Sequence, residues 1–86
     1  MNKYVDSISL GLPARTIVEK IDNDTLAIVI KRKSRIIMAD GKKILAKVAT
    51  IKTVKPGITV ILKTTTPICS KTLQLFDSED LEVLRD

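Results

Sequence analysis

The segment TLAIVIKRKSR, residues 25 to 35, constrains the fold more than any other part of the chain. Its first half, Leu26 to Ile30, would be apolar on both faces of an extended strand, which is typical of a strand covered from both sides. Residues 16 to 21, just before it, have the two-residue period of a strand, and Asp22-Asn23-Asp24 supplies a turn. These residues predict a β-hairpin whose second strand is the more deeply buried and ends among basic side chains.

Residues 36 to 54 admit two interpretations. Asp40-Gly41 is a common hairpin turn, and strands on either side of it would give a small all-β barrel, which stays open as the alternative fold. Apolar residues nevertheless recur at helical spacing, at Ile44, Leu45, Val48 and Ile51. The opposite side of the helical wheel holds Lys42, Lys43, Lys47 and Thr50. In a strand, Lys47 and Ile51 would share one face. The spacing therefore predicts an amphipathic helix over residues 41 to 53, with an earlier start near Ile36 left open, ended by Lys55-Pro56-Gly57.

Weaker patterns complete the predicted order of elements. Residues 2 to 10 place apolar side chains at helical spacing behind Asn2, so they predict a first helix. Residues 58 to 63 predict a buried strand, Thr66 and Pro67 the cap and the first position of another helix, and residues 81 to 84 a last strand. The order α-β-β-α-β-α-β makes residues 1 to 86 a single compact α/β (α+β) domain, a mixed sheet with helices packed on it.

Composition excludes several classes of chemistry. A single cysteine, Cys69, allows no internal disulfide and no cysteine-based zinc site, and the lack of histidine removes most other transition-metal sites and catalytic triads. We therefore predict no catalytic residue, metal ligand or cofactor. Tyr4 and Phe76 are the only aromatic residues, which argues against base stacking as a recognition mode. No apolar run is long enough to span a membrane, so we expect a cytoplasmic protein.

The charge balance favours an anionic partner, because 15 Lys and Arg against 10 Asp and Glu give a net charge of +5. Seven cations would share one surface if the basic end of the hairpin lies beside the outer face of the helix: Lys31, Arg32, Lys33, Arg35, Lys42, Lys43 and Lys47. Such a surface would bind the phosphates of DNA or RNA with little sequence specificity.

Two alternative interpretations of this basic surface involve no nucleic acid. The first is a solvated polar face that has no partner. The second is an assembly unit, a homodimer, in which the basic face meets an acidic segment such as Asp77 to Asp80 of a neighbouring copy.

A hairpin whose second strand ends in an apolar-x-Lys step, followed by an amphipathic helix and another strand, resembles the core of the restriction-endonuclease-like nucleases over about residues 14 to 84. The resemblance implies a divalent metal ion that two carboxylates hold against the scissile phosphate. Asp24 would supply the first carboxylate and Lys31 the lysine of the family pattern, but Val29 stands where the second carboxylate belongs. Glu19 on the neighbouring strand would have to replace it. The third interpretation is therefore a metal-dependent nuclease with an incomplete or rearranged site.

Cys69 has two interpretations of its own. It follows Pro67 at a predicted helix start, where a helix N-terminus lowers the pKa of a thiol and makes it nucleophilic. It also lies on an apolar stripe with Leu73 and Phe76. The stripe predicts that Cys69 is a small core residue.

Overall fold

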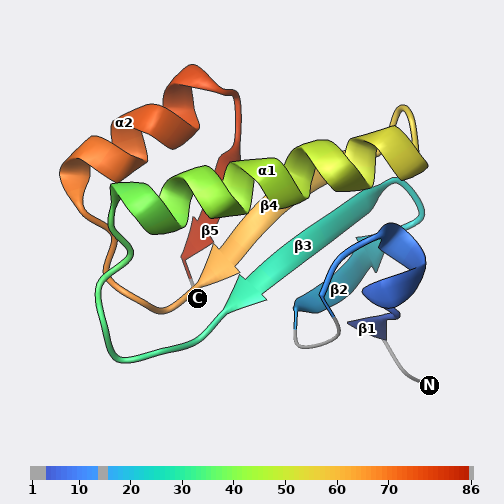
Figure 1. Cartoon of the computed structure of the whole chain (residues 1–86), viewed down its shortest axis with the longest axis horizontal. Coiled ribbons are helices and arrows are strands. Elements are labelled where there is room, and N and C mark those ends of the chain that lie inside the picture. The colour runs from blue at the N-terminus through green and yellow to red at the C-terminus, as the bar shows by residue number, and fades with distance from the viewer. Residues whose placement is uncertain (1–3, 14–15, 86) are drawn as a thin grey trace.

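The computed structural model describes residues 4–13 and 16–85, which form one sheet, two α-helices and a 3-10 turn (Figure 1). The strands are β1 (Tyr4–Val5), β2 (Ile17–Asp22), β3 (Thr25–Ile30), β4 (Thr59–Thr64) and β5 (Glu82–Arg85). The helices are α1 (Met38–Val54) and α2 (Ser70–Ser78), and the 3-10 turn η1 covers Ile8–Leu10. Within the described ranges, no helix combines the length and the apolar character that crossing a membrane requires.

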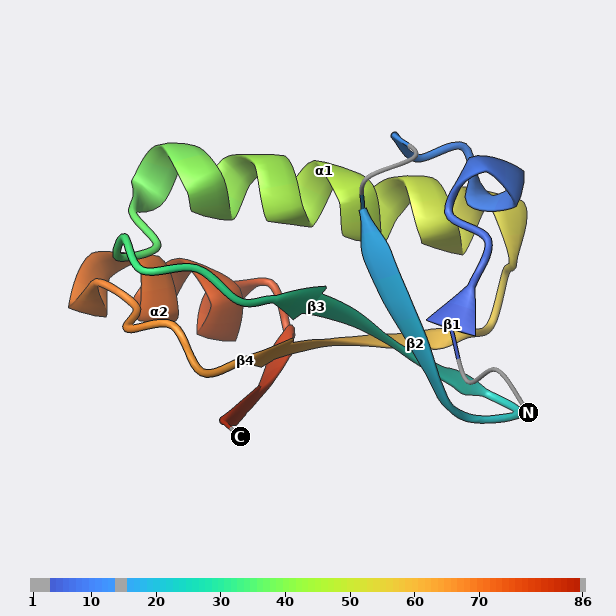
Figure 2. The same ribbon diagram turned by 90° about the horizontal axis from the view of Figure 1, so that it is seen from below.

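The sheet is mixed, and its strand order is β1-β2-β3-β4-β5. β1, β2 and β3 are antiparallel neighbours, whereas β3, β4 and β5 run parallel. A helix joins each parallel pair, and both connections step across the sheet in the same direction, so right-handed crossovers place α1 and α2 on the same face. Figure 2 shows α1 running along this face. We call the opposite side of the sheet the open face.

One apolar core fills the space between the sheet and the helices. Its buried members are Leu10, Leu12, Val18, Leu26, Ile28, Ile36, Ile44, Val48, Ile51, Val60, Leu62, Phe76 and Leu81. Alternate residues of β3 and β4 meet the i, i+4 and i+7 positions of α1 there, which is the pairing that the sequence periods predict. Aliphatic side chains make up almost all of this core, and Phe76 is its aromatic member.

On the open face, side chains instead of a helix cover β3. Ala27 pairs with Glu19 on β2 and with Ile61 on β4, and it is fully buried. Above it, Nζ of Lys63 lies 3.3 Å from both carboxylate oxygens of Glu19. The methyl group of Ala27 is small enough to leave room for this ion pair. The prediction that the second hairpin strand is buried on both faces is therefore confirmed.

The predicted fold class is confirmed, as a small α+β domain with a mixed sheet and helices packed on it. The all-β barrel is wrong, because the sheet is open and β1 and β5 form its edges. The helix predicted over residues 41 to 53 is present as α1 and starts three residues earlier, at Met38. The turn at Pro56 and Gly57 follows it, with Gly57 at a φ of +87°.

The helix predicted for residues 2 to 10 is wrong where the structure describes that segment. Tyr4 and Val5 form a strand that pairs with β2, and η1 follows it. Local hydrogen bonds replace a helical ladder here: the N–H of Ile8 donates to Asp6 Oδ1 at 3.1 Å, and Ser9 Oγ donates to the Asp6 carbonyl at 2.7 Å. Gly11 then ends the turn with a φ of +79°.

The predicted start of the second helix is also wrong. Thr66 does not cap it, because its hydroxyl donates to the Arg32 carbonyl and accepts the Arg32 N–H, both at 3.0 Å. Residues 65 to 69 are not helical: Thr66 lies at a bend, and Ile36 and Ile68 form a parallel bridge. The helix α2 therefore begins only after Cys69. The acidic segment Asp77 to Asp80 is divided between two elements, since Asp77 and Ser78 end α2 and Glu79 and Asp80 form the turn after it.

Gly41 marks the closest approach of the two helices, and it is not a hairpin turn. It lies buried in the first turns of α1, where an added Cβ would be 2.7 Å from Cγ2 of Thr72 and 3.4 Å from Cε1 of Phe76. Thr72 is itself fully buried and β-branched, so it has little freedom to move away. Only glycine fits this contact without displacing α2.

We expect the stabilities of Gly41 and Thr72 variants to be coupled. Gly41→Ala overpacks the contact, which costs about 1–3 kcal/mol and outweighs the roughly 1 kcal/mol that alanine adds in helix propensity. Thr72→Ser removes the obstructing methyl group, so it should destabilise the Gly41→Ala protein less than the wild type. Urea unfolding of the four proteins should give a coupling free energy of about 1 kcal/mol or more.

Ala49→Gly, on the exposed side of α1, serves as the control for propensity alone and should cost about 1 kcal/mol. Additive effects of Gly41→Ala and Thr72→Ser would contradict the proposed contact.

Candidate functional site

A groove of about 790 Å³ lies between α1, the end of β3 and the segment that leads into β2. We call it the basic groove, because four of the described residues that line it are Lys31, Arg32, Lys43 and Lys47. Gly11, Leu12, Pro13 and Thr16 form the opposite wall. The hydroxyl oxygen of Thr16 is buried there without a hydrogen-bond partner in the described chain.

Helical geometry places two lysines of α1 in the groove, Lys43 and Lys47, and keeps a third, Lys42, outside it. Lys43, Ala46, Lys47 and Thr50 line it from α1, at positions i, i+3, i+4 and i+7 of one helix face. Lys42 lies about 100° round the helix from Lys43, outside the groove and exposed. Lys31 enters from β3, directly after the last residue of that strand.

Arg32 is held in place by its own neighbourhood. Its guanidinium pairs with the Asp40 carboxylate in the first turn of α1 and donates to the carbonyls of Ser34 and Arg35, both at 3.2 Å. Asp40 also accepts the N–H of Ile37 at 3.1 Å. The Arg32 hydrogen bond and then the Ile37 N–H lower the pKa of Asp40 below its usual value. Arg32 therefore shapes the loop before α1, and Asp40 compensates its charge.

The three lysines of the groove are not held by ion pairs in this way, and Asp40 acts on Lys43 only at longer range. Lys31, Lys43 and Lys47 form no salt bridge with any described residue. The described lining of the groove also includes no carboxylate side chain. The groove thus carries an excess of positive charge, which attracts anions with several negatively charged groups.

The structure brings together four of the seven cations predicted to share a surface. Lys33 and Arg35 lie exposed in the loop between β3 and α1, and with Lys42 they are absent from the described lining of the groove. Sequence reasoning missed the wall formed by residues 11 to 13 and Thr16. No local pattern signals that wall, since it depends on how η1 packs against the end of α1.

The geometry does not assemble the metal site that the nuclease resemblance implies. Asp24 directly precedes β3 and Lys31 directly follows it, so the two lie roughly 20 Å apart along an extended strand. Glu19 binds Lys63 instead of turning toward Lys31. Among the described residues, no group of three or more Asp, Glu, Cys or His side chains converges on a metal position.

The structure corrects the interpretation of Cys69 as a core residue. Cys69 is only partly buried and is the residue that directly precedes α2. The backbone N–H of Thr72 and, after it, that of Lys71 stabilise the thiolate and lower the pKa of the Cys69 thiol. The effect of a helix start on this cysteine is therefore present, although the helix begins later than predicted.

Comparisons with known proteins add no relative. No protein-family model, no curated protein and no solved structure matches this chain.

The lowered pKa of Asp40 predicts a pH-dependent contribution to stability. A carboxyl whose pKa is lower in the folded state stabilises the fold above its unfolded pKa of about 4, and this contribution disappears as the pH falls through the folded pKa. Asp40→Asn should therefore lower the melting temperature at pH 7 and have little effect near pH 2. Asp24→Asn is the matched control, because the Asp24 carboxylate is exposed in the turn between β2 and β3 and forms no salt bridge with a described residue. An Asp40→Asn effect of equal size at both pH values would contradict the prediction.

The position of Cys69 predicts an alkylation midpoint below that of an ordinary thiol. The rate of reaction with iodoacetamide, measured against pH, should show a midpoint below about 8.5 in the folded protein. The same measurement in concentrated urea should return the ordinary midpoint, because the helix start is then lost. A folded midpoint equal to or above the unfolded one would show that α2 does not stabilise the thiolate.

Proposed function

We propose that this protein is a small non-enzymatic module that binds nucleic acid in the basic groove, through phosphate contacts and with little sequence specificity. The observation that carries the proposal is the convergence of Lys31, Lys43 and Lys47 on one groove with no described carboxylate in its lining. These lysines come from a strand end and from a helix face, so the fold and not a local run of charge brings them together. A polyanion is the partner that uses all three.

The chemistry of the groove favours contact with the backbone over contact with base edges. Lysine ammonium groups bind phosphates as point charges and do not impose the planar, paired geometry with which arginine selects guanine. Arg32, the arginine among the described residues of the groove lining, already directs its guanidinium to Asp40 and to two backbone carbonyls. Phosphate contacts position a nucleic acid without selecting its sequence, so we expect weak discrimination between sequences.

The salt dependence of binding tests this proposal. Three phosphate contacts predict that the logarithm of the association constant falls with the logarithm of salt concentration at a slope of about −2 to −3. Lys43→Gln combined with Lys47→Gln should reduce that slope by about two and weaken binding to every sequence alike. Fluorescence anisotropy of labelled oligonucleotides between low and physiological salt measures both effects.

Lys42→Gln combined with Lys52→Gln is the matched control, because it removes the same charge from exposed positions of α1 outside the groove. If the two double variants weaken binding equally, net charge and not the groove is responsible. If the wild type does not bind at low salt, the nucleic-acid proposal fails. An assembly unit would then be the better proposal.

A further inference from the structure

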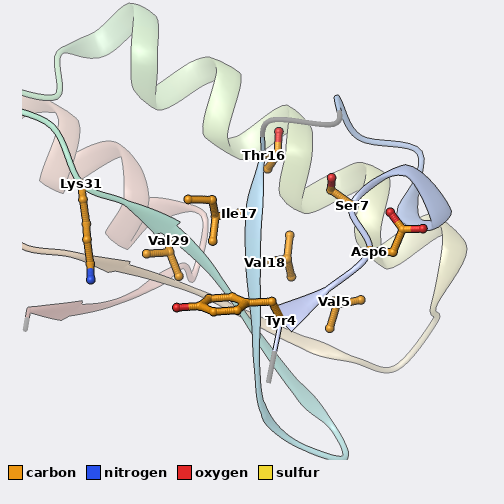
Figure 3. A pocket seen from close by; sticks show the side chains of 9 residues that line it. All are labelled: Tyr4, Val5, Asp6, Ser7, Thr16, Ile17, Val18, Val29 and Lys31. Atoms are coloured by element: carbon orange, nitrogen blue, oxygen red, sulfur yellow. The ribbon is translucent and has the colours of Figure 1, made fainter. Parts of the chain in front are cut away.

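A second cavity, of about 380 Å³, lies at the corner of the sheet where the chain leaves β1. We call it the corner pocket, and Figure 3 shows the residues that line it: Tyr4, Val5, Asp6, Ser7, Thr16, Ile17, Val18, Val29 and Lys31. It exists because the pairing of β1 with β2 ends at Val5, opposite Val18. Beyond that pairing, Asp6 and Ser7 turn away, and the start of β2 is left without an outer neighbour.

The sheet register aligns three side chains, those of Tyr4, Ile17 and Val29, on the open face beside this pocket, and we call them the apolar row. Ile17 pairs directly with Val29, and Tyr4 pairs with Glu19, which makes Tyr4 the diagonal neighbour of Ile17. Lys31 follows Val29 by two residues and continues the row on the same face. Figure 3 shows the Tyr4 side chain crossing β2 toward Val29 and Lys31. Tyr4 and Ile17 are 49% and 50% exposed, so a ligand can reach both.

The corner pocket and the basic groove share a wall. Thr16, Ile17, Val29 and Lys31 line both of them. A ligand that binds its phosphate at Lys31 in the groove therefore has the apolar row of the pocket within reach. The two cavities together offer one site with a cationic part and an apolar, aromatic part.

The chemistry of the pocket favours an uncharged ring over a second phosphate. The Asp6 carboxylate lines it and repels anions. Its remaining walls include Val5, Ile17, Val18 and Val29, and its volume lies within the roughly 300–1,000 Å³ of small-molecule sites. The ring of Tyr4 supplies a stacking surface, whereas Phe76, the other aromatic residue, is fully buried. A base within a duplex cannot enter, because both of its faces are already stacked.

We infer that the corner pocket receives one unpaired base of a single-stranded nucleic acid whose adjacent phosphate is bound in the basic groove, with the base against the Tyr4 ring. This inference rests on the proposed function and narrows it to single strands. With two aromatic residues in the chain and Phe76 fully buried, base stacking is limited to Tyr4. Loss of one base–aromatic contact weakens single-strand binding by about 5- to 100-fold.

Tyrosine fluorescence provides a direct test, because the chain has one Tyr and no Trp, so that Tyr4 is the main intrinsic fluorophore. An unlabelled single-stranded oligonucleotide should quench this emission as it binds, and a duplex of the same sequence should quench it much less. Quenching by the ribo or the deoxyribo form supports the inference equally. Tyr4→Ala should weaken binding of a labelled single strand by about 5- to 100-fold and leave its salt slope unchanged. Tyr4→Phe should retain binding.

Leu84→Ala is the matched control, because Leu84 is an exposed apolar residue of β5 that does not line the pocket. Ile17→Ala tests the facing wall if Tyr4→Ala disturbs β1. It should weaken single-strand binding more than duplex binding, because Ile17 lines the groove as well as the pocket. Salt-dependent binding without quenching, or duplex binding tighter than single-strand binding, would overturn the inference and leave the groove proposal intact. Absence of any binding at low salt would overturn both.

Discussion

Both faces of β3 must be kept from water, and the chain achieves this differently on each side. On one side, Leu26 and Ile28 join the core that α1 and α2 cover. On the open face, Glu19 and Lys63 close over Ala27, with 3.3 Å between Nζ and each carboxylate oxygen. Their side chains are only 10% and 19% exposed, so the pairing offsets part of the cost of removing each charge from water. The ion pair thus protects the central strand without a second layer of helices.

This one-sided architecture explains why the corner of the sheet remains accessible. A helix on the open face would cover Tyr4 and Ile17 and remove the corner pocket. The end of the β1–β2 pairing at Val5 has a similar effect at the edge, because a β1 that continued past Val5 would close the side of β2 that borders the pocket. The ion pair between Glu19 and Lys63 also neutralises the acid nearest to Tyr4 in the sheet.

Neighbouring cations at the end of β3 have different roles because side chains alternate between the two faces of a strand. Lys31 continues the open-face row of Ala27 and Val29 and lies at the border of both cavities. Arg32 turns to the helix side, where Asp40 and the carbonyls of Ser34 and Arg35 hold its guanidinium. Two adjacent cations of one basic run therefore differ: Lys31 is exposed at the border of both cavities, and Arg32 orders the start of α1.

The sequence by itself determined the elements whose pattern lies in adjacent residues, which are the hairpin of β2 and β3 and the helix α1. It also determined the net charge of +5. Apolar residues that recur every 2 or every 3.6 positions predict a strand or a helix in any fold that buries the apolar side of that element. Only the tertiary structure decided that Tyr4 and Val5 form a strand, since two residues have no period and depend on pairing with β2. It also kept Thr66 from capping α2, because Arg32, its partner, lies 34 residues away. For the same reason it brought together Lys31, Arg32, Lys43 and Lys47 out of the seven predicted cations. Their convergence depends on packing between distant segments, which local patterns do not encode.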